Sequence, residues 1–176
     1  MNYLKIATIV LIEVIFCLLF VLQADARRDP QVQFSVIFEK TEYDPKEAIS
    51  IEFKLKNTGR SPIYVNKRFH VNTEDKPPAA REVSFQVTGP SGEKLPDKVF
   101  YDTGFPKTDY FVLLDPGGEV GLERSKNLQA YFDFSEAGKY KIIAVYQNVY
   151  GPEIGLDAFK DELKSKAVTI EIIENK

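Results

Sequence analysis

The sequence contains very few of the residues that metal sites and enzyme active sites use most often. Among its 176 residues there are one His, one Cys, one Met and no Trp. A zinc hydrolase of the His-Glu-x-x-His type needs two His, and a disulfide framework needs paired Cys, so the composition excludes both. The net charge of −3 offers no general attraction to nucleic acid, whose phosphates require clustered Lys and Arg. We therefore expect no metal site, no cofactor and no nucleic-acid partner.

What the sequence does contain is typical of one globular domain. Charged residues make up 28% of the chain and hydrophobic residues 44%. This balance excludes an intrinsically disordered chain and a membrane protein with several spans. A second complete domain would be cramped within 176 residues, so a single folded domain is expected.

Residues 1–26 have the features of a secretory signal peptide. A cationic start precedes the apolar run Ile6–Leu22, and small residues follow at the positions that signal peptidase reads. As a membrane span this run is short, and Glu13 in its middle would be costly in hydrocarbon. We predict cleavage after Ala26 and a mature domain at residues 27–176. An uncleaved N-terminal anchor is the alternative, and only then would the protein be attached to a membrane.

The remaining chain has the features of an exported bacterial protein. Its only Cys, Cys17, lies in the predicted signal peptide, so the mature protein has no disulfide. Small extracellular domains of animals are usually disulfide-bonded, whereas bacterial envelope proteins often are not. No Asn begins an Asn-X-Ser/Thr glycosylation site. We therefore predict a bacterial protein of the periplasm or the extracellular space.

Apolar and polar residues alternate with a period of two along most of the mature chain, as in half-buried β-strands. The predicted strands are Val32–Phe38, Ile49–Leu55, Ile63–Asn66, Val83–Val87, Val99–Tyr101, Tyr110–Leu114, Val120–Leu128, Tyr140–Tyr146 and Val168–Ile172. Only Leu156–Leu163 has helical spacing, and it is short enough to be a turn within a loop. Eight or nine short strands separated by turns predict an all-β fold, an antiparallel β-sandwich.

A local pattern points to a particular kind of sandwich. Residues 133–142 resemble the tyrosine corner of immunoglobulin-like folds, where a Tyr entering the penultimate strand hydrogen-bonds to the backbone upstream. Tyr140 would be that structural Tyr, and Ile142 would take the buried position that a disulfide Cys holds in antibodies. The alternative is an ordinary Tyr at the start of a strand.

Several longer segments resemble those of bacterial secreted immunoglobulin-like domains. They are Tyr43–Ile49, Leu55–Gly59, Ile63–Val65, Leu114–Glu119, Glu136–Tyr140 and Leu163–Val168. The resemblance covers most of residues 32–173 and implies an immunoglobulin-like β-sandwich of eight or nine strands. Similar modules accompany the catalytic domain of aspzincin metalloproteases, and a sandwich of related appearance serves as the BsuPI-type proteinase inhibitor. Because the shared segments consist of turns and strands, they imply an architecture and no chemistry.

We predict that the protein is not an enzyme. His70 is the only imidazole, and no Gly-x-Ser-x-Gly nucleophile motif accompanies it. Glycan hydrolysis needs only two carboxylates across a cleft, so a carboxylate-dependent glycan hydrolase is the enzyme alternative. The acids in predicted loops or at strand ends are Asp97, Asp102, Asp109, Asp115 and Asp133. Such loop acids more often serve solubility than catalysis.

Two groups of residues are candidates for contact with a partner. Phe105 lies between Gly and Pro in a loop, where a large apolar side chain either caps the end of the sandwich or meets another protein. Tyr101 and Tyr110 belong to the same aromatic segment. The candidate cationic patch consists of Lys67, Arg68 and His70. It would suit anionic glycans or lipid headgroups, and a solvated mixed surface is the alternative.

These observations predict an exported, non-catalytic immunoglobulin-like binding module. Its partner is expected to be another envelope or extracellular protein, bound through end loops or an exposed strand edge. A secreted proteinase inhibitor is the alternative, with its reactive loop at Pro77–Ala80 or Gly104–Thr108. The sequence leaves the identity of the partner and the oligomeric state open.

Overall fold

The computed structural model describes residues 31–73, 76, 81–98, 104, 106–122 and 125–174. The predicted signal peptide at 1–26 and the predicted strand Val99–Tyr101 lie outside these residues. Residues from Gln31 onward form a compact unit of their own. Across the described ranges, no helix has the length and apolar character needed to cross a membrane.

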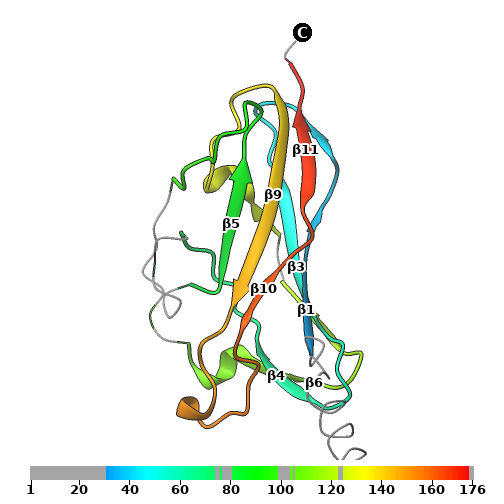
Figure 1. Cartoon of the computed structure of the whole chain (residues 1–176), viewed down its shortest axis with the longest axis vertical. Helices are drawn as coiled ribbons and strands as arrows, with labels where there is room; N and C mark the ends of the chain where they lie inside the picture. The colour runs from blue at the N-terminus through cyan, green and yellow to red at the C-terminus, as the bar shows by residue number, and fades with distance from the viewer. Residues whose placement is uncertain are drawn as a thin grey trace, which may run out of the picture. The chain divides into compact units, whose positions relative to one another are not determined.

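Short strands joined by turns make up this unit (Figure 1). The strands are β1 (Val32–Phe38), β2 (Glu42–Tyr43), β3 (Ser50–Asn57), β4 (Ile63–Asn66), β5 (Val83–Thr88), β6 (Phe111–Leu114), β7 (Glu119–Gly121), β8 (Lys126–Asn127), β9 (Gly138–Gln147), β10 (Glu162–Lys164) and β11 (Val168–Ile172). Single-turn 3₁₀ helices are η2 (Thr108–Tyr110), η3 (Leu128–Ala130) and η4 (Pro152–Ile154). The prediction of an all-β protein is confirmed.

The strands form two large sheets and one small one. In the first sheet β3 pairs antiparallel with β1 on one side and with β7 and β8 on the other. In the second sheet β9 pairs antiparallel with β5 on one side and with β10 and β11 on the other. β2 adds to the far edge of β11 as the parallel strand of this sheet. Figure 1 shows β5, β9 and β11 in front of β1 and β3.

The hydrophobic core lies between the two large sheets, because alternate residues of each strand face inward. Phe53 of β3 is its central aromatic residue: its ring centroid lies 5.8 Å from those of Phe34 and Phe85 and 5.7 Å from that of Phe69. Phe34 also meets Tyr146 of β9 at 5.6 Å. Rings from both sheets therefore contact one another directly.

The third sheet is the antiparallel pair of β4 and β6, which lies at the lower end of the molecule in Figure 1. The buried Asn57, at the end of β3, fastens it in place. Its Nδ2 donates to the carbonyls of Ser61 and Leu114, both at 2.9 Å. On the far side of β4, the Tyr64 carbonyl accepts from the Phe159 N–H at 2.8 Å. We refer to this pair of strands as the end ribbon.

Some predicted elements differ from the observed ones. The predicted strand Val120–Leu128 is two short strands, β7 and β8, and Leu128 belongs to η3. Asn127 explains the second break, because its Oδ1 accepts from the Gln129 N–H at 3.1 Å and so begins the 3₁₀ turn. The segment Leu156–Leu163 is not a helix, and its last residues belong to β10. β2 and β10 were not predicted.

Tyr140 makes a local contact at the start of β9. Its buried side chain meets Phe134 edge-on at 4.9 Å, and its hydroxyl donates to the Glu136 carbonyl at 2.7 Å. Burial raises the pKa of this hydroxyl, so it stays protonated and able to donate. The hydrogen bond links the turn before β9 to the strand itself.

We expect the substitution Tyr140→Phe to lower the free energy of unfolding by about 1 kcal/mol, since it removes this bond and keeps the ring. Urea unfolding would measure the change. Tyr64→Phe is the matched control, because no hydrogen bond of the Tyr64 hydroxyl is present among the described residues. Equal midpoints for the two variants would contradict the expectation.

Candidate partner-binding site

The end ribbon exposes a large apolar side chain. Leu113, in the middle of β6, is 47% exposed, whereas Phe111 and Leu114 on the same strand are buried. Alternation along the strand places Leu113 on the face opposite Leu114, together with Phe111, and of these two side chains Phe111 is buried and Leu113 is open to solvent. Val112 and Ile63 are half-buried against the core beside it.

The backbone of β6 is open at the same place. Lys67 donates its N–H to the Tyr110 carbonyl at 2.8 Å, which fixes the alternation of hydrogen bonds along the ribbon. In that alternation the pair Tyr64–Leu113 is not hydrogen-bonded to each other, and the Tyr64 carbonyl accordingly points to Phe159. The N–H and C=O of Leu113 therefore point away from β4, and no described residue pairs with them.

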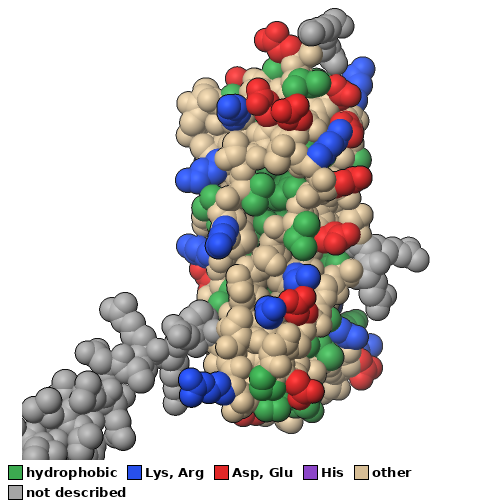
Figure 2. All heavy atoms as spheres, turned by 90° about the vertical axis from the view of Figure 1, so that its right-hand side faces the viewer, with side chains coloured by type: hydrophobic (Ala, Val, Ile, Leu, Met, Phe, Trp, Pro, Cys, Tyr) green, Lys and Arg blue, Asp and Glu red, His purple; other side chains and the backbone are tan. Residues whose placement is uncertain are grey.

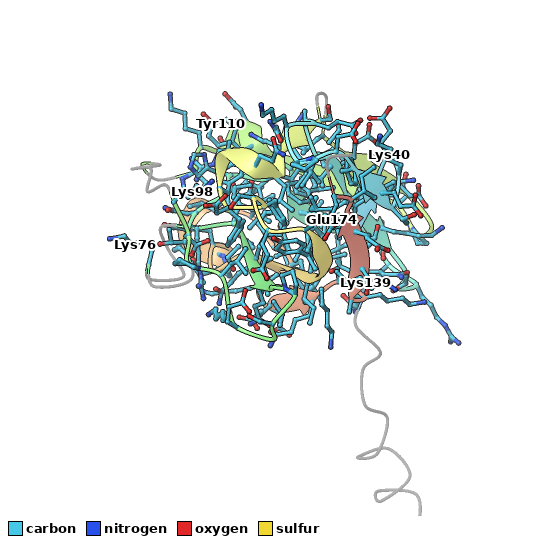
Figure 3. All side chains as sticks on the ribbon, turned by 90° about the horizontal axis from the view of Figure 1, so that it is seen from above. Lys40, Lys76, Lys98, Tyr110, Lys139 and Glu174 are labelled. Atoms are coloured by element: carbon cyan, nitrogen blue, oxygen red, sulfur yellow. The ribbon has the colours of Figure 1, made fainter. Side chains whose placement is uncertain are left out.

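Tyr110 lies directly before β6, in η2. Its ring is half-buried under the guanidinium of Arg68, whose Cζ lies 5.1 Å from the ring centroid. In the view along the long axis, Tyr110 lies near the rim of the molecule, on the opposite side from Lys139 (Figure 3). Lys67, which bonds to its carbonyl, is exposed. An aromatic ring, a cation and Leu113 thus border one open strand edge.

A buried ion pair holds this region against the second sheet. Glu82, directly before β5, is 4% exposed, and its Oε1 accepts from Arg68 Nε at 2.7 Å and Nη2 at 2.6 Å. The same oxygen accepts from Asn66 Nδ2 at 2.8 Å, and Oε2 accepts from the His70 N–H at 2.9 Å. Tyr146 of β9 donates its hydroxyl to the Asn66 carbonyl at 3.0 Å. We call these residues the Glu82 network.

The chain between Arg68 and His70 adopts an unusual conformation to reach Glu82 from both sides. Phe69 has φ of 47°, in the left-handed region that residues with a side chain rarely occupy. Its ring is fully buried, stacked on Phe53 and 6.1 Å from Tyr146. Such a conformation costs about 1–3 kcal/mol and persists because the surrounding contacts hold it.

The titratable groups of the site are either neutral or paired within the fold. Burial lowers the pKa of His70, so the neutral imidazole is favoured, and burial raises the pKa of the Tyr146 hydroxyl. Arg68 is 14% exposed and paired with Glu82, so its charge is compensated within the fold. Within the described ranges, no three His, Cys, Asp or Glu residues come together in a way that could hold a metal ion.

The predicted site residues have different positions in the structure. Tyr101 and Phe105 lie outside the described residues, and Tyr110 lies beside the end ribbon. Of the three cations of the candidate patch, only Lys67 is exposed; Arg68 is bound to Glu82, and His70 is half-buried. Tyr140 lies in β9, in the second large sheet and not in the end ribbon.

Sequence reasoning missed Leu113 and Glu82. Leu113 could have been found, because four consecutive apolar residues in a strand cannot all face one core. Glu82 had no such signal. No protein-family model and no curated protein matches this chain, so what the site binds is inferred from its geometry.

Proposed function

We propose that this protein is an exported, non-catalytic immunoglobulin-like module that binds another protein of the cell envelope or the extracellular space. The observation that carries the proposal is the exposed Leu113 on the open edge of β6. A protein partner suits this combination, because an added strand satisfies the free backbone groups while its own apolar residues cover the leucine.

The order of the strands supports the immunoglobulin-like part of the proposal. In such folds, strands A, B and E share one sheet, and strands C, F and G share the other. By their pairing, β1, β3 and β7 would correspond to A, B and E, and β5, β9 and β11 to C, F and G. Tyr140, which enters β9 with its hydroxyl on an upstream carbonyl, has the geometry of a tyrosine corner.

We expect the partner to contribute an extended segment with an apolar residue opposite Leu113. The surroundings of the edge carry charges of both signs, since Lys67, Lys107, Asp109 and Asp115 are all exposed. Such a mixed rim favours a partner of mixed charge over a strongly anionic glycan or membrane surface. The Glu82 network keeps the edge in a fixed position, which reduces the entropy lost on binding.

Site-specific photo-crosslinking tests the proposal. The full chain is expressed in the organism from which it comes, with a photoreactive phenylalanine derivative at position 113. The matched control carries the derivative at position 173, where Ile173 is 42% exposed. We expect one reproducible crosslinked protein from position 113 and none from position 173. Crosslinks of equal pattern from both positions would show that Leu113 marks no specific site.

The substitution Leu113→Glu should reduce capture of that protein at least about tenfold, because it places a charge in the apolar contact. Ile173→Glu should leave capture unchanged. Because the photoreactive residue would occupy the substituted position, these variants are made without it, and the amount of the identified protein that co-purifies with each variant, measured by quantitative mass spectrometry, decides between these results. A captured protease that the purified protein inhibits would instead identify a proteinase inhibitor.

A further inference from the structure

β1 is an edge strand without the usual protection. It has seven residues, Val-Gln-Phe-Ser-Val-Ile-Phe, with no charge, no Pro and no Gly. Natural edge strands are usually short, or carry charges, Pro or a bulge, because free backbone groups otherwise recruit another strand. Ile37 adds an apolar side chain that is 44% exposed.

The register of β1 determines which of its backbone groups are free. The Thr58 N–H donates to the Gln31 carbonyl at 2.9 Å, so the odd-numbered residues of β1 exchange hydrogen bonds with β3. The even-numbered residues from Val32 to Phe38 therefore direct their N–H and C=O groups away from the sheet. In the ranges that the structure describes, nothing pairs with these groups.

The other edges of the two large sheets are protected. β7, β8 and β10 have two or three residues each and contain Glu119, Lys126, Glu162 or Lys164. On the side of β5 that faces away from β9, the Val83 N–H donates to the His70 carbonyl, and the Val83 carbonyl accepts from the Asn72 N–H. The outer side of β11 pairs with β2. Among the described edge strands of the two large sheets, β1 is thus the longest uncharged one and the one whose outward backbone groups are open along its whole length.

We propose that two copies of the chain form a two-fold symmetric dimer in which β1 pairs antiparallel with β1 of the second copy. The axis would pass beside Ser35, so that Ser35 faces Ser35 of the second copy. In this register every even-numbered residue of β1 faces another even-numbered residue, and all the outward backbone groups are satisfied. The four strands β1, β3, β7 and β8 of each copy would form one continuous sheet across the dimer.

The side chains of β1 are self-complementary in this register. Phe34 would face Val36, and Val32 would face Phe38, so each large ring meets a smaller β-branched side chain. Ile37 would face Gln33, which covers its exposed surface. No like charges come together in this register. Figure 2, which shows the side of the molecule that lies at the right in Figure 1, has hydrophobic side chains near the middle of that side. A second copy of this chain is the occupant that such a symmetric strand fits.

Sedimentation velocity over about 1–100 μM tests the proposal, the range in which a contact of this size should be populated. The full chain is used, produced in an exporting host. We expect a concentration-dependent dimer. Ser35→Lys and Ser35→Glu should each raise the dissociation constant at least about tenfold, because like charges then face each other at the axis. Ser35 lies on the outer face, so both variants should fold.

An equimolar mixture of the two variants should restore a dimer, since Lys then faces Glu across the axis. Restoration by mixing separates the proposal from a folding defect, which mixing cannot repair. Gln33→Lys is the matched control: its new charge faces Ile37, and the dimer should persist. A monomeric wild-type protein throughout the range, or no dimer in the mixture, would overturn the proposal.

Discussion

The substitution Arg68→Met should lower the free energy of unfolding by about 3–5 kcal/mol, because it leaves Glu82 charged and uncompensated in the protein interior. The methionine keeps much of the apolar length of the arginine side chain but donates nothing to the Glu82 carboxylate. Asn66 and the His70 N–H still donate to Glu82 and limit the loss. Chemical denaturation, with the midpoint and slope compared to the wild type, measures the change.

A matched substitution in an exposed ion pair distinguishes the effect of burial from the effect of removing a charge. Lys56 forms an ion pair with Glu119 at 2.9 Å, but both side chains are largely exposed, at 45% and 37%. Lys56→Met therefore should change stability little, since exposed pairs are screened by water and Lys54 still faces the same carboxylate. Equal losses of unfolding free energy in the two variants would show that the buried pair of Arg68 and Glu82 contributes no more to stability than the exposed pair.

The effect of Arg68→Met should also reach the candidate site. Arg68 covers the ring of Tyr110, and Lys67 beside it bonds to the Tyr110 carbonyl. Loss of the guanidinium frees the start of β6, and with it the position of Leu113. We therefore expect weaker capture of the partner in this variant, although the Arg68 side chain itself is only 14% exposed.

The large strands could be predicted because their signal is local. β1, β4 and β11 have the predicted bounds, and β3, β5 and β9 differ by a few residues at most, since alternate residues must face a core whatever the partner strand is. β2 and β10 have two and three residues of mixed polarity. They exist as strands because β11 and β9 offer backbone groups to them, which no local pattern encodes.

The candidate site could be predicted only in part, for a similar reason. Tyr110 was a predicted contact residue because it belongs to the same aromatic segment as the loop residue Phe105, although it was also predicted to begin a strand. Arg68 was predicted to belong to a cationic surface patch, because Arg side chains usually lie at the surface. Its partner Glu82 is 14 residues away in the sequence and is brought beside it only by the fold. The left-handed conformation of Phe69, which makes this possible, has no sequence signal, as the position is not Gly or Asn.

The second large effect is expected in the core, where Phe53→Ala should lower the free energy of unfolding by about 3–5 kcal/mol. Phe53 is 1% exposed, and its ring contacts Phe34, Phe69 and Phe85. Removal of the ring loses its transfer free energy and leaves a cavity between the sheets. Phe53→Leu, which fills part of the space, should lose less, and Ile173→Ala at an exposed position should lose little.

A ligand distinguishes an open cavity from a collapsed one. The walls of the Phe53→Ala cavity would be aromatic and dry, so benzene should bind there and raise the thermal midpoint of this variant but not of the wild type. No rise would mean that neighbouring rings have moved in. Phe69 is the ring whose movement matters most, because its φ of 47° is held by stacking on Phe53. Relaxation of Phe69 would draw Arg68 and His70 away from Glu82, so a cavity in the core would loosen the end ribbon as well.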